Sequence, residues 1–174
     1  MNCVIVNIGS NLGDRRMNLS RALRKIGMEF GPFEVSHAVE SDPWGYESEN
    51  KFLNMAVMFW SHLSPVEILS RLQNIEQQLS AAPHRDDSGK YLDRVIDIDL
   101  IAVDDIVFDN TTDINRKSDP ALRLPHHALA QRRFFLEPLA EIAPGWRHPV
   151  SGLTADEMLT RLDDKKTGKD DIDG

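Results

Sequence analysis

The segment from Arg94 to Ile101 carries the residues best suited to chemistry, because its apolar side chains alternate with Asp97 and Asp99. Side chains alternate along a strand, so the two aspartates share one face, about 6 to 7 Å apart along the chain. Aspartate is depleted in strands, and like charges on one face repel each other unless a cation lies between them. Magnesium prefers one or two carboxylates plus phosphate oxygens, so the pair predicts a magnesium site. The alternative is a solvated edge strand with two incidental acids.

Basic residues gather next to this segment. Arg94 lies three residues before Asp97, and the preceding loop contains a histidine, a lysine and Arg85. Phosphoryl transfer depends on positioning and on neutralising phosphate charge, which cations beside a metal provide. Asp97, Asp99, Arg94 and Arg85 are therefore the candidate catalytic residues for magnesium-dependent transfer of a phosphate-type group. Simple solvation of a polar segment would also explain the loop cations.

Other candidate motifs are weaker. The turn residues from Gly9 to Gly13 either bring the backbone close to a ligand or form a plain turn, and no Walker-type Gly-Lys-Ser/Thr motif is present. His126-His127 has neither the spacing nor the cysteine partners of a zinc site. No nucleophile-elbow or cysteine-centred motif supports covalent catalysis. Metal-assisted transfer remains the favoured chemistry.

Strand and helix patterns follow one another in an order that could position these residues. β-branched residues at 2–8 indicate a strand, and apolar residues at helical spacing from Met17 to Met28 indicate a helix. A capping box, with Ser64 before the helix and Glu67 at its third position, begins a second helix. Further strands are expected at 33–40, 52–60 and 95–103.

The order strand, helix, strand, strand, helix, strand predicts an α+β fold of the ferredoxin-like, split βαβ type, with helices packed on one antiparallel sheet. Residues 80–93 are polar and long for a connection, so this loop is either functional or disordered. Residues 104–123 are expected to form turns and loop, and Arg132–Ala140 a helix. A capping-box pattern at Thr154 precedes a last short helix, which would pack outside the central unit.

Composition indicates one globular domain. The chain has 174 residues, of which 41% are hydrophobic and 28% charged, with a mean hydropathy of -0.38. Its net charge of -8 opposes a general attraction to nucleic acid or to an anionic membrane. We expect a single domain over 1–162. The tail 163–174 has five aspartates, three lysines and almost no apolar residue, so we expect it to be disordered.

Cysteine content and the N-terminus favour a cytoplasmic location. The single cysteine, Cys3, precludes an internal disulfide and suits a reducing compartment. The first residues lack the basic region and the apolar core of an export signal. No apolar run approaches the ~20 residues that a membrane-spanning helix requires.

Seven short motifs occur in one order along the chain. They are Gly9-Ser10-Asn11-Leu12-Gly13, Pro43-Trp44-Gly45, Phe52-Leu53-Asn54, Ile75-Glu76, Arg94-Val95-Ile96-Asp97-Ile98-Asp99-Leu100, Leu124-Pro125-His126 and Arg133-Phe134-Phe135-Leu136-Glu137-Pro138-Leu139. In this order the chain resembles the 6-hydroxymethyl-7,8-dihydropterin pyrophosphokinase family of folate biosynthesis. The resemblance spans about residues 3 to 160, nearly the whole chain.

The resemblance implies transfer of the β,γ-pyrophosphoryl unit of ATP to the hydroxymethyl oxygen of the pterin, leaving AMP, with two magnesium ions between the substrates. Asp97 and Asp99 match the metal-binding aspartates. The positions that match nucleotide contacts are Gln73, Glu76, Arg94, Ile101, His126 and Arg132. Those that match pterin contacts are Pro43, Trp44, Phe52, Asn54 and Phe134. The implied partners are these two small molecules, without nucleic acid or membrane, in a monomer or weak homodimer.

One region departs from the family pattern. Family members usually have Gly-Arg-x-Arg after the second helix and Trp-Gly-Pro-Arg before the metal strand, where this chain has residues 80–85 and Tyr91-Leu92-Asp93-Arg94. Arg94 is retained, and Tyr91 supplies an aromatic ring near the tryptophan position. Two other functions stay open. One is a ferredoxin-like module for single-stranded RNA, although its aromatic motif is absent. The other is a family member that binds substrates without catalysis.

Overall fold

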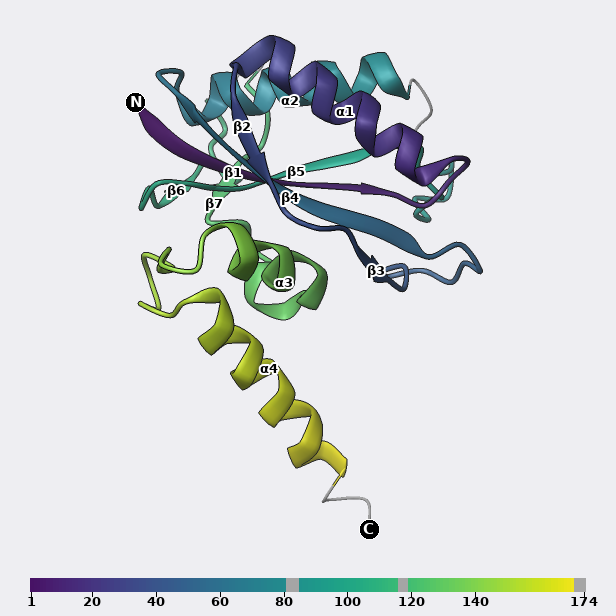
Figure 1. The fold of residues 1–174 in the computed structure, drawn as a ribbon, viewed down its shortest axis with the longest axis vertical. Helices are drawn as coiled ribbons and strands as arrows, with labels where there is room; N and C mark the ends of the chain where they lie inside the picture. Colours follow the sequence, from purple (N-terminus) through teal and green to yellow (C-terminus); the bar gives the residue numbers. More distant parts are fainter. Residues whose placement is uncertain (81–84, 116–118, 171–174) are drawn as a thin grey trace.

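The centre of the fold is a five-stranded antiparallel sheet (Figure 1). The computed structural model describes residues 1–80, 85–115 and 119–170. The strands are β1 (Asn2–Ser10), β2 (Phe33–Val35), β3 (Val39–Ser41), β4 (Phe52–Ser61) and β5 (Asp97–Val103). They lie in the order β2-β4-β1-β5, and β3 also pairs with β4, so the first strand is central. This order is that of the ferredoxin-like fold, and the predicted fold class is confirmed.

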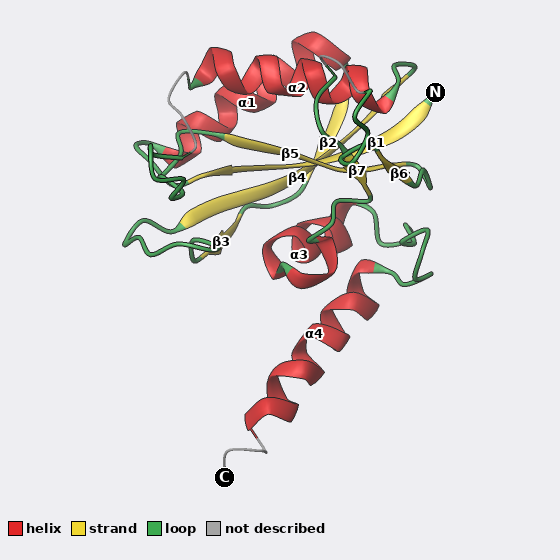
Figure 2. Cartoon of the chain, turned by 180° about the vertical axis from the view of Figure 1, so that it is seen from behind, coloured by secondary structure: helices red, strands yellow, loops and turns green. Residues whose placement is uncertain are grey.

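Helices cover both faces of the sheet. α1 (Arg15–Phe30) and α2 (Pro65–Leu79) lie side by side on one face, while α3 (Arg133–Ile142) lies on the other and α4 (Ala155–Asp170) extends away from it (Figures 1 and 2). A 3-10 turn, Leu129–Gln131, leads into α3. The predicted capping box begins α2, since Ser64 Oγ accepts from Glu67 N and Glu67 Oε2 accepts from Ser64 N. None of the helices within the described ranges is long and apolar enough to cross a membrane.

The core is divided into two clusters by the sheet. On β1, Val4, Val6 and Ile8 pack toward α1 and α2, whereas Ile5 packs toward α3 with Phe135. Both faces of β1 are therefore buried in the segment that contains these residues, which explains its nearly continuous apolar sequence. Burial on both faces anchors β1 and gives its neighbours a fixed register.

The segment 33–40 differs from the sequence expectation. The single strand predicted there is divided into β2 and β3. Val35 pairs with Val57 and Val39 pairs with Asn54. From Val35 to Val39 the chain therefore advances four residues, while the facing segment of β4 advances only three. Ser36 occupies the interruption, and its Oγ accepts a hydrogen bond from Ala56 N at 2.9 Å. Such an extra residue is a β-bulge, which periodicity does not reveal.

The region 104–123 also contains more structure than the turns and loop expected there. Two short strands, β6 (Phe108–Asp109) and β7 (Arg123–Leu124), pair with each other. Each strand has only two residues, which is too few to produce an alternating pattern. Residues 116–118 lie outside the described residues.

The C-terminal helix extends into the segment expected to be disordered. α4 continues to Asp170, so residues 163–170 are helical. Its first turns are anchored by the buried Ala155 and Met158, which pack in the cluster with α3, and Arg133 of α3 pairs with Asp163. Helix growth from an anchored turn is easier than helix nucleation, so charged residues that would not form a helix alone extend this one. The last predicted tail residues, 171–174, lie outside the described part of the chain.

Candidate active site

Polar residues from β1, β4 and β5 meet on the sheet face that carries α3. Asp97 pairs with Gly9, which pairs in turn with Asn54, and Asp99 pairs with Asn7. The residue between the two aspartates, like the one that follows them, packs in the cluster on the opposite face. The sequence prediction that Asp97 and Asp99 share one face, away from the apolar residues, is therefore confirmed.

A first cavity of about 200 Å³ lies over this face. Its lining combines aromatic rings, amides, acids and bases. The lining residues are Asn7, Ser41, Asp42, Trp44, Tyr46, Phe52, Asn54, Tyr91, Arg94, Asp97, Asp99, His126, His127, Arg132 and Phe134. The rings and amides suit a flat ligand with polar edges.

A second cavity, of about 420 Å³, lies on the other side of the aspartate pair. Gln73 and Glu76 of α2 line it, and Glu76 Oε2 accepts a hydrogen bond from Ile98 N at 2.8 Å, which ties α2 to the acidic strand. Asp97 and Asp99 line both cavities. If one ligand bound in each cavity, the two ligands would therefore meet at these carboxylates.

Burial and like charge perturb the aspartate pair. Burial raises the pKa of Asp99 well above its usual value, and the neighbouring Asp97 raises it further, while Arg132 opposes the change. Asp97 is paired with Arg94, whose Nη1 lies 2.7 Å from Asp97 Oδ2. The side chains of Asp97 and Asp99 are 21% and 26% exposed, so both remain accessible to a ligand.

His126 is a neutral neighbour of the pair. Burial lowers the pKa of His126 to about 3, and the adjacent His127 and Arg132 contribute. The 3.7 Å between His126 Nε2 and Asp99 Oδ1 is too long for a hydrogen bond, and a neutral ring makes no ion pair. Since His126 Nδ1 accepts from Ala128 N, the ring proton belongs on Nε2, which faces Asp99.

The glycine-containing turn after β1 holds Arg94 in place. Asn11 Oδ1 accepts a hydrogen bond from Arg94 N at 2.6 Å, and Asn11 N donates to Arg94 O at 3.0 Å. Asn11 Nδ2 also donates to Asp93 Oδ1. The Asp93 carboxylate accepts further hydrogen bonds from Tyr46, Ser48 and Asn50. Through Asn11 and Asp93, the turn therefore links the loop 42–51 to Arg94, which precedes β5.

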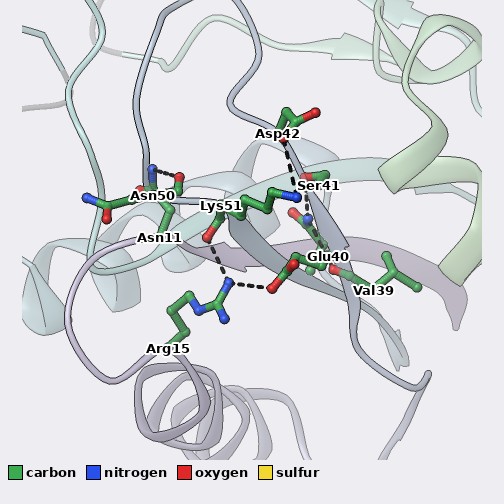
Figure 3. A network of polar contacts seen from close by, with 9 residues as sticks. Asn11, Arg15, Val39, Glu40, Ser41, Asp42, Asn50 and Lys51 are labelled. Carbon is green, nitrogen blue, oxygen red and sulfur yellow. Dashed lines mark hydrogen bonds and ion pairs between the residues drawn. The ribbon is translucent and has the colours of Figure 1, made fainter.

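The ends of the loop 42–51 are also attached to α1 and to β3 (Figure 3). Arg15 Nη1 donates to Glu40 Oε2 at 3.1 Å and to Lys51 O at 2.9 Å, and Lys51 Nζ lies 3.9 Å from Asp42 Oδ1. Trp44 lies between these anchors and lines the first cavity. The loop is thus held at both ends, with Trp44 near its start.

The structure brings together most of the residues selected from sequence. In the first cavity lie Trp44, Phe52, Asn54, Arg94, Arg132 and Phe134. Gln73 and Glu76 line the second cavity, and His126 lines both. Residues 81–84 of the polar loop lie outside the described residues.

Three of the selected residues do not line either cavity. The side chain of Ile101 is 2% exposed and packs in the core beside α3, while its carbonyl oxygen accepts from His126 N. Arg85 lies 3.7 Å above the ring of Tyr91, which does line the first cavity. Pro43 lies between two lining residues, Asp42 and Trp44. A contact between these residues and a ligand in either cavity would therefore have to be made by the backbone or through a neighbouring residue.

Tyr91 and His127 line the first cavity without having been selected as site residues, and sequence reasoning missed four further lining residues: Asn7, Ser41, Asp42 and Tyr46. Asn7 had a usable signal, because it is a polar residue inside an otherwise apolar strand and lies in phase with Gly9. The other three lie at the end of an edge strand or in a loop, where no periodicity predicts the direction of a side chain.

Comparison with known proteins agrees with this arrangement. A family model described as 7,8-dihydro-6-hydroxymethylpterin-pyrophosphokinase (HPPK) matches residues 5–144. The 2-amino-4-hydroxy-6-hydroxymethyldihydropteridine pyrophosphokinase of Porphyromonas gingivalis is 38% identical over 150 residues, covering 86% of this chain and 95% of the relative. The enzyme of the same name from Aquifex aeolicus is 33% identical over 150 residues, covering 86% of each.

A solved structure supports the fold. The crystal structure of Plasmodium falciparum HPPK-DHPS wild type with SDX-DHP superposes with a TM-score of 0.73 at 16% identity, covering 92% of this chain and 43% of that chain. At this identity the similarity shows the ferredoxin-like architecture alone. The sequence matches extend over most of the chain, and from them it follows that this chain belongs to the 7,8-dihydro-6-hydroxymethylpterin-pyrophosphokinase family.

Proposed function

We propose that this chain transfers the β,γ-pyrophosphoryl unit of ATP to the hydroxymethyl oxygen of 6-hydroxymethyl-7,8-dihydropterin, giving the pterin diphosphate and AMP. The observation that carries the proposal is that Asp97 and Asp99 line two cavities at once. One cavity has the rings and amides that suit a pterin, and the other has the polar side chains of α2. The names of the relatives agree with this reaction.

The cofactor proposed for the carboxylate pair is magnesium, in two ions. Two partly exposed carboxylates fit this hard cation, which takes its remaining ligands from water and phosphate oxygens. The described residues contain no cluster of three or more His, Cys, Asp or Glu that could hold a metal ion. Bound magnesium would neutralise phosphate charge as it develops.

The proposed phosphate contacts are Arg94 and Arg132, with Arg85 closing from the loop. The Nε atoms of Arg94 and Arg132 are buried without a hydrogen-bond partner among the described residues, which suits side chains that receive an anionic ligand. During transfer, the hydroxymethyl oxygen releases its proton to water and forms a bond to the β-phosphorus, while the bond from that phosphorus to the oxygen bridging to the α-phosphate breaks. The departing AMP carries that oxygen, and fixed guanidinium groups offset its charge.

The proposed pterin contacts are the rings of Phe52 and Phe134 on either face and the amide of Asn54 at the edge, with Pro43 and Trp44 in the adjoining loop. The proposed nucleotide contacts are Gln73, Glu76 and His126, together with the backbone at Ile101. We also propose that residues 1–162 function as one domain, in the cytoplasm, as a monomer or weak homodimer.

The direct test is an assay of AMP release. Purified protein with ATP, magnesium and hydroxymethyl-dihydropterin should release one AMP for each pterin diphosphate, and EDTA should stop the reaction. Release of ADP would indicate transfer of a single phosphate instead. Binding of both substrates without any AMP would identify a family member that has lost catalysis.

Gly9 provides a specific test of the pterin cavity. A Cβ atom at this position would lie 2.8 Å from Asn54 Oδ1 and 3.3 Å from Phe52 Cδ1, so Gly9→Ala must displace both side chains. Because the displaced Asn54 and Phe52 side chains would no longer fit the pterin that they are proposed to contact, we expect the pterin KM to rise about tenfold or more, with the ATP KM unchanged. Gly145→Ala is the control, since a Cβ there meets nothing within 4 Å. Steady-state kinetics that do not differ between the two variants would contradict the proposed cavity.

A further inference from the structure

Asn7 is a buried asparagine in the middle of β1 that no part of the proposed reaction yet uses. It is 3% exposed, lines the first cavity, and lies between Ala56 on β4 and Asp99 on β5. Asn7 Oδ1 is buried without a hydrogen-bond partner among the described residues.

Other buried asparagines in the described ranges are hydrogen-bonded. Asn18 Nδ2 donates to Ser10 Oγ and Leu12 O, Asn54 Nδ2 donates to Ser41 Oγ, and Asn110 exchanges hydrogen bonds with Pro120 O and Leu122 N. An unpaired buried polar group costs about 1–3 kcal/mol. An apolar side chain would avoid this cost, as Ile5 does two residues earlier on the same face. A partner supplied by a ligand would offset the cost.

The position of Asn7 indicates which part of the ligand it meets. Directly opposed residues on adjacent strands have Cβ atoms about 4.5–5.5 Å apart, and diagonal ones about 7–8 Å apart. Asp99 is the direct neighbour of Asn7, and Asn54 is the diagonal neighbour on the other strand. Asn7 therefore lies between the carboxylate at the reacting end and the amide proposed to contact the pterin edge.

We propose that the side-chain amide of Asn7 hydrogen-bonds the hydroxymethyl group of the bound pterin and selects for that group. This inference rests on the proposed function, because it deepens the description of the same cavity. An amide offers both a donor and an acceptor, so it pairs with a hydroxyl group in either direction. Fixing that hydroxyl also limits the directions from which its oxygen approaches the phosphorus.

The test compares two pterins in the wild type and in two Asn7 variants. Calorimetry with magnesium and a non-hydrolysable ATP analogue would measure the Kd of 6-hydroxymethyl-7,8-dihydropterin and of 6-methyl-7,8-dihydropterin, which lacks the hydroxyl. The wild type should prefer the hydroxymethyl form about tenfold, which is the value of one hydrogen bond with a neutral partner. Asn7→Ala and Asn7→Ser should each reduce the preference to about threefold or less, with unchanged affinity for the ATP analogue.

Stability gives a second measurement with a matched control. Because the Asn7 amide is unpaired in the free protein, Asn7→Ala should keep or raise Tm. Asn110→Ala removes a hydrogen-bonded amide outside both cavities, so Tm should fall while the hydroxymethyl preference stays at the wild-type value. A retained preference in both Asn7 variants, or a fall in Tm for Asn7→Ala as large as for Asn110→Ala, would overturn the assignment. Failure of the wild type to bind either pterin would instead refute the proposed function.

Discussion

Asp97→Asn and Asp99→Asn are each expected to lower kcat by about a hundredfold or more at saturating magnesium. Each substitution keeps the shape of the side chain but removes one full charge from the point where the two cavities meet. Loss of charge weakens magnesium binding and leaves phosphate charge less well neutralised. AMP release at several magnesium concentrations is the measurement. Wild-type turnover in both variants would show that these carboxylates do not bind the metal.

The stability of the same variants separates a catalytic defect from a folding defect. Asp99→Asn should keep or raise Tm, because burial and the charge of Asp97 disfavour the Asp99 carboxylate in the folded state. The Tm of Asp97→Asn should rise less, because this substitution also removes the carboxylate whose Oδ2 lies 2.7 Å from Arg94 Nη1. Asp113→Asn is a suitable control, because Asp113 caps an exposed turn outside both cavities, and it should retain wild-type turnover.

Phe134→Ala is expected to weaken pterin binding about tenfold or more without changing the affinity for the ATP analogue. The ring of Phe134 lines the cavity together with Phe52, and it packs edge-on against Phe135 with centroids 4.7 Å apart. Its removal takes away one face of the proposed aromatic clamp. Asn54→Ala should reduce the affinity for pterin by more than the small size of the side chain suggests, because a polar edge of the pterin is then left unpaired in a closed site.

Calorimetry with each ligand distinguishes a lost clamp from a destabilised core. Phe30→Ala is the matched control, since Phe30 stacks on Phe59 at 4.4 Å on the other face of the sheet and lines neither cavity. We expect this control to lower Tm while pterin affinity is kept. If Phe134→Ala bound pterin as the wild type does, or lost ATP affinity to the same degree, the ring would have to be regarded as an ordinary core residue.

The sequence alone determined features that depend on short distances along the chain. The shared face of Asp97 and Asp99 follows from the alternation of side chains in a strand, and the start of α2 follows from Ser64 and Glu67. The order of elements was enough for the fold class, because few arrangements of these strands and helices bury their apolar faces. Local geometry is encoded by neighbouring residues, so it is visible without a structure.

Only the tertiary structure determined which distant residues meet. Asn11 holds Arg94 across 83 positions of sequence, and Asn54 occupies the space that Gly9 leaves free on the next strand. The neighbours of Asn7 on β4 and β5 depend on the register of three strands, since a slip of one residue would turn its side chain to the opposite face. Register results from packing both faces of the sheet against helices, which is a property of the whole fold and is not present in any short segment of the sequence.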